Sequence, residues 1–172
     1  MKKPSKNKGF TIVEAIIVIA IFGVLLAVAA PSLTDYLNQV QSRQNTNEFL
    51  SSLLLARSEA VTRNSMVSMC MTDSSAPQVC DSDNGWHEGW IAFEDVDGDG
   101  TRDIGDELVE QHSGLDDTSV VSSVNFSDHV TYLPSGSVSS SGSFTVCVGG
   151  SSARSIVVNA TGRPRLTEAT CP

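Results

Sequence analysis

The chain has 172 residues, enough for about one domain. It carries 11 basic and 20 acidic residues, and the resulting formal charge of −9 argues against a protein that coats nucleic acid, which would need a basic face. A hydrophobic content of 40% excludes a disordered acidic tail. All four lysines lie between Lys2 and Lys8, and no acidic residue precedes Glu14. A short basic leader therefore precedes an acidic chain.

Residues 10–30 form an apolar segment in which Glu14 is the single ionisable residue. As a helix this segment would be about 31 Å long, close to the thickness of a bilayer core. One interpretation is a secretory signal cut after Ala29. The other is a retained transmembrane helix, with the lysines in the cytoplasm and the rest of the chain outside. The length of the run and the carboxylate favour retention, because a charge within a membrane is costly and marks a functional position.

The segment from Lys8 to Glu14, KGFTIVE, resembles the class III signal of type IV prepilins and type II secretion pseudopilins. The resemblance implies that residues 1–9 are a leader peptide, which prepilin peptidase cuts between Gly9 and Phe10. It implies methylation of the new amino group of Phe10. It also implies that Glu14 pairs with the terminal amine of a neighbouring subunit during assembly, which agrees with the need of a buried carboxylate for a cation.

Residues 31–64 continue the helical pattern with a more polar composition. Pro31 lies where pilins commonly carry a helix-kinking proline. The apolar residues recur at spacings near three and four, and they are Leu33, Leu37, Val40, Phe49, Leu50, Leu53, Leu54, Ala60 and Val61. The pattern predicts an amphipathic continuation of the membrane helix, with one face covered by a globular domain.

Residues 65–172 show the shorter periodicity of strands, interrupted by Gly, Asp, Asn and Ser. The candidate strands are Met66–Thr72, Trp90–Glu94, Leu108–Gln111, His129–Leu133, Phe144–Val148 and Ser155–Asn159. The Ser/Gly-rich segment Pro134–Ser143 is predicted to be a flexible loop. Together these patterns predict an α+β protein in which one long helix packs on an antiparallel sheet.

The four cysteines are Cys70, Cys80, Cys147 and Cys171. An even number in an exported domain favours two disulfides, and the sequence leaves three pairings open. In the pairing of sequence neighbours, each bond would contribute about 3 kcal/mol. A zinc site is the rival interpretation, but the chain has no CxxC pair and its histidines are not at ligand spacing.

A wider resemblance covers most of the chain. The segment Ala56–Asn64, then Cys70, Trp86–Phe93 and the acidic run that follows are similar to the GspH/FimT pilin domain, and Thr161–Arg165 (TGRPR) resembles the GRxR motif of FimT/FimU-type minor pilins. The resemblance implies a pilin fold and a minor pilin that assembles with other major and minor pilins. Such a protein is held in the inner membrane with a periplasmic domain and then reaches the pilus and cell surface. A type II secretion pseudopilin shares the domain and is the alternative.

The GRxR motif is associated in this family with DNA binding during natural transformation. By resemblance, Arg163 and Arg165 would contact phosphates of double-stranded DNA, with Gly162 allowing the turn and Arg154 joining them if its strand lies adjacent. So few arginines predict weak, salt-sensitive binding without sequence specificity. The ordinary alternative is that these arginines cap a turn or pair with an acidic neighbour such as Glu168.

The run from Asp95 to Asp106 is close to the DxDxDG calcium loop, with acids at positions 1, 3, 5, 9 and 12. The candidate ligands are Asp95, Asp97, Asp99, Asp103 and Asp106. Asp and Gly also suit a β-hairpin turn without any ion, and this interpretation is preferred. Calcium is the one cofactor suggested, and an exported calcium-binding module is a third possible function.

The sequence contains no GxSxG elbow, Ser-His-Asp grouping, phosphate loop or dinucleotide fingerprint. Trp86 and Trp90 resemble core residues beside a strand more than a ligand platform. We therefore expect a protein that is not an enzyme.

Overall fold

The structure, a computed structural model, describes residues 9–73, 75–150 and 152–172. The predicted leader up to Lys8 and the side chains of residues 27–32, Pro31 among them, lie outside the described part. The chain divides into two compact units, Met1–Leu37 and Asn38–Pro172. Each is described by itself.

The first unit contains the start of α1 (Ile12–Arg63). The Thr11 side chain caps this start by accepting a hydrogen bond from the Glu14 N–H (3.3 Å), and the Thr11 N–H donates in return to Glu14 Oε2 (3.1 Å). This reciprocal pair is a capping box. The apolar side chains that follow are exposed, Ile12 by 82% and Val24 by 67%. Within the described residues, no helical stretch is both long enough and apolar enough to cross a membrane.

In the second unit, α1 buries one stripe of side chains, but Val40, Leu54 and Val61 of the predicted apolar pattern are exposed. Phe49, Leu53, Ala56 and Ala60 are fully buried and follow one another at helical spacing. The helix ends at Arg63, and Asn64 adopts a left-handed conformation (φ 53°). A left-handed residue directly after a helix is a common way to stop it and turn the chain away.

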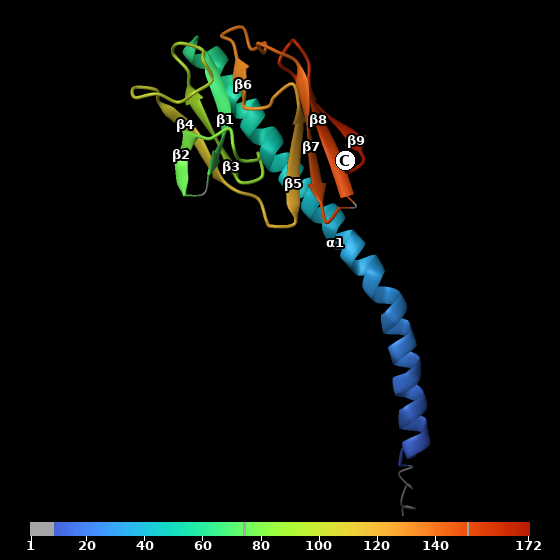
Figure 1. Ribbon diagram of the computed structural model, residues 1–172. Coiled ribbons are helices and arrows are strands. Elements are labelled where there is room, and N and C mark those ends of the chain that lie inside the picture. Colours follow the sequence, from blue (N-terminus) through green and yellow to red (C-terminus); the bar gives the residue numbers. More distant parts are fainter. Residues whose placement is uncertain (1–8, 74, 151) are drawn as a thin grey trace, which may run out of the picture. The chain divides into compact units, whose positions relative to one another are not determined.

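Two antiparallel sheets follow the helix (Figure 1). The first has the order β2-β1-β3-β4, with β6 also paired to β1. Its strands are β1 (Val67–Asp73), β2 (Ala76–Cys80), β3 (Gly89–Glu94), β4 (Leu108–Ser113) and β6 (His129–Tyr132). The second has the order β5-β7-β8-β9. Its strands are β5 (Ser119–Val124), β7 (Gly142–Val148), β8 (Ser152–Val158) and β9 (Pro164–Ala169). The α+β class is confirmed, and the expected sheet is divided into two.

One core joins the helix to both sheets. The Phe49 ring of α1 lies 4.9 Å from Trp90 in the first sheet and 4.7 Å from Phe144 in the second, measured between ring centroids. Trp86 is also buried, and its indole N–H donates to the Phe126 carbonyl (3.1 Å). Both tryptophans are therefore core residues, as expected.

The cysteines form the two bonds between sequence neighbours, which selects one of the three pairings left open. Cys70–Cys80 joins β1 to β2, with the Cα atoms 5.6 Å apart. Cys147–Cys171 joins β7 to the segment after β9, with a Cα separation of 5.5 Å. Because β8 lies between β7 and β9, the second bond ties the end of the chain across one strand.

Candidate functional site

The arginine turn, residues 159–165, comprises the connection between β8 and β9 and the first two residues of β9. The Gly162 N–H donates to the Asn159 carbonyl (2.8 Å). The side-chain oxygen of Asn159 accepts from the Thr161 hydroxyl (2.7 Å) and from the Arg163 N–H (3.3 Å). Uncharged groups therefore shape this turn, and the guanidinium groups are not needed to hold it.

Gly162 fixes the arginine turn against a neighbouring turn. It adopts φ +73°, and a Cβ atom there would lie 2.0 Å from the Gly136 carbonyl oxygen. That oxygen also accepts a hydrogen bond from Arg57 Nε of α1 (2.8 Å). Only glycine fits such a close backbone approach. The helix thus positions the arginine turn through Gly136.

The Ser/Gly-rich segment that contains Gly136 is a hydrogen-bonded turn. The Gly136 N–H donates to the Leu133 carbonyl (2.7 Å), and the Leu133 N–H donates to the Ser137 carbonyl (2.8 Å). The sequence predicted only a flexible loop here, because its composition carries no strand or helix pattern. Neither this role nor that of Arg57 was predicted.

Arg163 and Arg165 project from the arginine turn into solvent. Both are exposed, and neither side chain has an ion pair or hydrogen bond within the described part of the chain. Arg163 directly precedes β9 and Arg165 is the second residue of this strand, so the two exposed arginines are close neighbours along the chain. The alternative that they pair with Glu168 is not realised in the structure.

Arg154 lies on the neighbouring strand but on the opposite face. In the register of β8 and β9, Arg165 pairs with Val157, whereas Arg154 pairs with Glu168. Because side chains alternate along a strand, Arg154 and Val157 point to opposite sides of the sheet. The structure therefore places Arg165 and Arg154 on opposite faces of the second sheet.

The acidic loop, residues 95–106, connects β3 to β4 and is built around one buried carboxylate. Asp95 is fully buried. Its oxygens accept hydrogen bonds from the Gly98 N–H (2.8 Å), the Gly100 N–H (3.1 Å) and the Ser68 hydroxyl (2.5 Å). These three hydrogen bonds give the buried Asp95 carboxylate its partners without an ion, as in other turns organised by an aspartate.

The structure brings together three of the five candidate calcium ligands. Oxygens of Asp95, Asp97 and Asp99 can lie within 4.8 Å of one another, and this is the one such acidic group among the described residues. Asp103 and Asp106 are outside it, and the Asp103 N–H donates to the Asp106 side chain (2.9 Å). Calcium binding remains a prediction, which calorimetric titration of the parent chain against Asp97→Asn would test.

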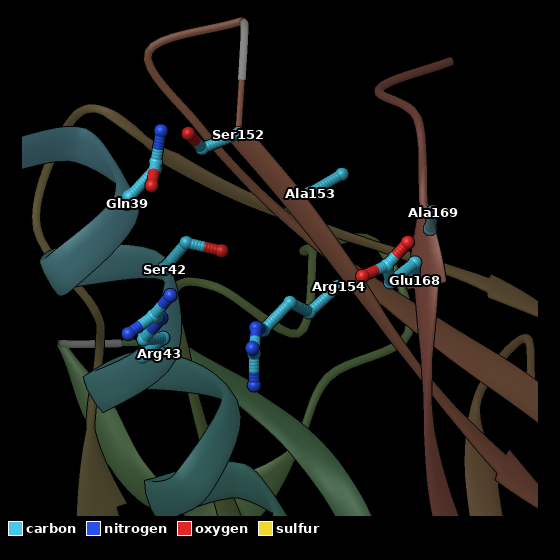
Figure 2. Close-up of a pocket in the computed structure, with 8 residues that line it drawn as sticks. All are labelled: Gln39, Ser42, Arg43, Ser152, Ala153, Arg154, Glu168 and Ala169. Atoms are coloured by element: carbon cyan, nitrogen blue, oxygen red, sulfur yellow. The ribbon is translucent and has the colours of Figure 1, made fainter. Parts of the chain in front are cut away.

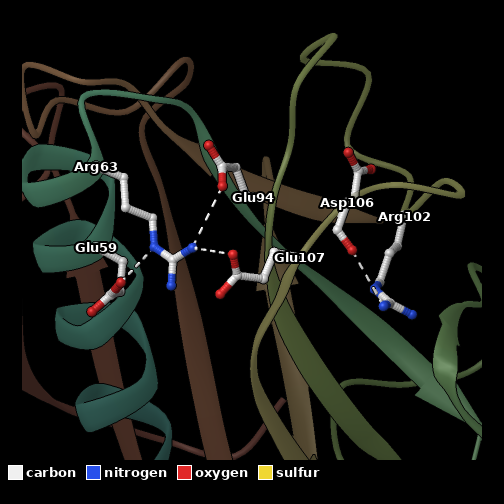
Figure 3. Close-up of polar contacts among 6 residues, drawn as sticks. All are labelled: Glu59, Arg63, Glu94, Arg102, Asp106 and Glu107. Atoms are coloured by element: carbon white, nitrogen blue, oxygen red, sulfur yellow. Dashed lines mark hydrogen bonds and ion pairs between the residues drawn. The ribbon is translucent and has the colours of Figure 1, made fainter.

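Arg63 beside the acidic loop and Arg102 within it both make contacts that support the fold (Figure 3). Arg63 forms ion pairs with Glu59 (2.6 Å), Glu107 (3.1 Å) and Glu94 (3.4 Å). The hydrogen bond that Arg63 Nε donates to the Glu59 carboxylate is the main reason that the pKa of Arg63 is raised. Arg102 donates instead to two backbone carbonyls, those of Gln78 (3.0 Å) and Asp106 (3.3 Å). Neither guanidinium is available to a ligand in this arrangement.

A long amino-terminal helix packed on antiparallel sheets behind a methylation signal defines a pilin-like subunit. The family model described as type II transport protein GspH matches residues 45–162, more than half of the chain. The chain therefore belongs to the GspH family of minor pilins and pseudopilins. The model of the prokaryotic N-terminal methylation motif matches residues 4–30, as the leader sequence predicted.

Individual relatives agree with this family. The chain is 46% identical over 42 residues to the type IV major alpha-pilin and to fimbrial protein Q, both of Moraxella bovis, and it spans about a quarter of the length of each. Among solved structures, the type IV minor pilin FimU of Pseudomonas aeruginosa matches 77% of this chain and 92% of its own, with 20% identity and a TM-score of 0.59. The minor pseudopilin EpsH of Vibrio cholerae matches 74% and 97%, with 14% identity and a TM-score of 0.51. These structures support the fold.

Proposed function

We propose that this chain is a minor type IV pilin. It is made as a prepilin, cut by prepilin peptidase between Gly9 and Phe10, and methylated on Phe10. Residues 10–30 hold it in the inner membrane with the domain in the periplasm. It is then assembled with other pilins into a pilus at the cell surface. The methylation motif together with the GspH family supports this proposal.

Glu14 changes its hydrogen-bond partner during assembly. In the single chain its carboxylate accepts hydrogen bonds from the N–H and the hydroxyl of Thr11, at 3.1 and 3.0 Å. A terminal ammonium from a neighbouring subunit would add a charge to this neutral cap, and a charged partner forms the stronger hydrogen bond. Glu14 therefore stabilises the helix start before assembly and pairs between subunits afterwards.

Mass spectrometry of the amino terminus, after expression with a prepilin peptidase, tests the maturation step. The expected species begins with methylated Phe10. A species that begins with Ala30 would contradict the proposal, because it would show that residues 1–29 are removed as a secretory signal.

We also propose that the arginine turn contacts double-stranded DNA. The observation that carries this step is the pair of exposed guanidinium groups, Arg163 and Arg165, on a backbone held in place by Gly162. A preformed turn loses little conformational entropy on binding. Two phosphate contacts give a weak affinity with a modest dependence on salt. Several subunits in one filament would raise this affinity through avidity.

A gel-shift titration of the full mature chain in detergent tests this contact. We expect the double variant Arg163→Gln/Arg165→Gln to bind DNA roughly tenfold more weakly than the parent, because it loses both phosphate contacts. Equal shifts for the parent and the variant would remove the arginine turn from the proposed function.

A type II secretion pseudopilin is the second candidate, favoured by the name of the matching family model. The two candidates differ in the phenotype of a strain that lacks the gene. We expect loss of piliation or DNA uptake with normal protein secretion. A secretion defect in a normally piliated strain would favour the pseudopilin.

A further inference from the structure

A polar pocket of about 270 Å³ lies in the second unit, between α1 and the β8–β9 ladder. We call it the arginine pocket because Arg43 of α1 and Arg154 of β8 face it from its two walls, with Glu168 of β9 beside Arg154 (Figure 2). It lies on the opposite face of the second sheet from Arg165, since Arg154 and Arg165 project to opposite sides. The arginine pocket is thus separate from the arginine turn.

The arginine pocket carries a surplus of positive charge. Neither Arg43 nor Arg154 has an ion pair within the residues that the structure describes. Glu168 is the one acidic residue that lines the pocket. Two guanidinium groups against one carboxylate leave a net charge of about +1, so the pocket favours a single additional anionic group.

A buried hydroxyl marks the wall of the pocket formed by α1. Ser42 is only 2% exposed, and its Oγ has no hydrogen-bond partner in the described part of the protein. A buried hydroxyl without a partner is costly, so such groups normally bond to a carbonyl, a water or a ligand. The pocket therefore combines two positively charged guanidinium groups with a buried hydroxyl that has no hydrogen-bond partner among the described residues.

The opposite pole of the second unit carries matching negative charge. Asp97, Asp99 and Asp103 of the acidic loop are exposed and have no ion pair among the described residues. Arg63, which pairs with Glu94 and Glu107 on either side of this loop, is on the same helix as Arg43. At 1.5 Å per residue these two arginines lie about 30 Å apart along the helix. The two charged features therefore cannot meet within one chain.

We propose that the arginine pocket binds a carboxylate of the acidic loop of a second copy of this chain, in a head-to-tail contact. The inference rests on the proposed role as a filament subunit, because a contact between two different surfaces generates an open helical array when its rotation does not close. Arginine and a carboxylate form paired, directional hydrogen bonds, so the contact fixes orientation as well as adding affinity.

A carboxylate side chain fits this pocket better than a phosphodiester of DNA. Asp and Glu carry their charge at the end of a stem that can enter a recess, whereas a DNA phosphate is part of a continuous backbone. Glu168 would also repel the row of charges on a duplex. The DNA contact is assigned to the other face of the sheet.

Charge exchange between two versions of the full mature chain tests the proposal. One version carries Arg43→Glu/Arg154→Glu and the other Asp97→Arg/Asp99→Arg. Association is measured by sedimentation velocity in detergent with EDTA at low salt. We expect the parent to associate and each version alone to do so at least tenfold more weakly. The equimolar mixture should regain association, because the unaltered pocket of the second version then meets the unaltered loop of the first, and the reversed pocket meets the reversed loop.

Glu168→Gln provides a matched control within the pocket. Removing the opposing carboxylate should strengthen the association of the parent chain by several-fold, and 0.3 M salt should weaken it. Failure of the mixture to regain association would overturn the proposal. A pocket variant that loses DNA binding as fully as Arg163→Gln/Arg165→Gln would overturn it in favour of a nucleic-acid site. The mature amino terminus of the same samples reports separately on the proposed function.

Discussion

The arginine turn and the acidic loop are both charged connections between paired strands, yet they use their charges differently. In the arginine turn, Gly162 and Asn159 shape the backbone, and the charged side chains point into solvent. In the acidic loop, buried Asp95 shapes the backbone itself. A charged turn is therefore better evidence for a ligand when neutral groups already satisfy its backbone, as they do at the arginine turn.

The largest effect that this comparison predicts is at Gly162. Gly162→Ala would combine left-handed strain with a clash against the Gly136 carbonyl, and we expect a loss of about 2 to 5 kcal/mol in unfolding free energy. Urea denaturation measures it. Gly150→Ala is the matched control, because Gly150 has φ +69° but no atom within 4 Å of the added Cβ. Equal losses for the two variants would show that the contact with Gly136 contributes nothing.

The sequence was sufficient to predict the helix and the buried strands β1, β3 and β7, because their apolar residues recur with the periods of a helix and of a strand. It missed β2, β5 and β9. The strand β9 is an exposed edge strand with the polar sequence PRLTEA. It therefore lacks the apolar alternation from which a strand is predicted. Edge strands are often kept polar in this way, which limits pairing with other chains.

The residues of the arginine turn could be found from the sequence, but their arrangement could not. The side of the sheet on which Arg154 lies depends on the register between β8 and β9. The short turn sets this register, and no local sequence pattern predicts it. The contact of Gly162 with Gly136 joins two turns that are distant in sequence. The arginine pocket joins α1 to β8 and β9, so no motif could have pointed to it.

A smaller effect is expected at the buried acid of the acidic loop. Asp95→Asn leaves at least one of the three donors opposite an amide N–H₂ group, and we expect a loss of about 1 to 3 kcal/mol in unfolding free energy. Asp97→Asn, at an exposed position of the same loop, should change it by less than about 0.5 kcal/mol. If both variants had the same stability as the parent, the structural role assigned to Asp95 would be wrong.

The smallest effect concerns an acid outside both connections. Asp116 accepts hydrogen bonds from Thr118, Asn45 and Ser119, and these bonds, that of Thr118 foremost, lower its pKa. A lowered folded-state pKa stabilises the protein above the unfolded-state value of about 4, and this stabilisation is lost as pH falls through the folded-state pKa. The urea midpoints of the parent and Asp116→Asn should therefore differ at pH 7 and converge below pH 4. Asp117→Asn should match the parent throughout, and a difference for Asp116→Asn that does not shrink at all between pH 5 and the lowest pH at which the chain is folded would exclude titration of Asp116 as its cause.

The most direct test of the central claim is the salt dependence of DNA binding for Arg165→Gln and Arg154→Gln. Each variant removes one arginine from adjacent strands, so net charge and local composition change equally. We expect Arg165→Gln to lower the slope of log affinity against log salt by about 1. Arg154→Gln, on the other face, should keep the slope of the parent. Equal changes for the two variants, or no change for Arg165→Gln, would contradict the assignment of the arginine turn as the DNA-contacting surface.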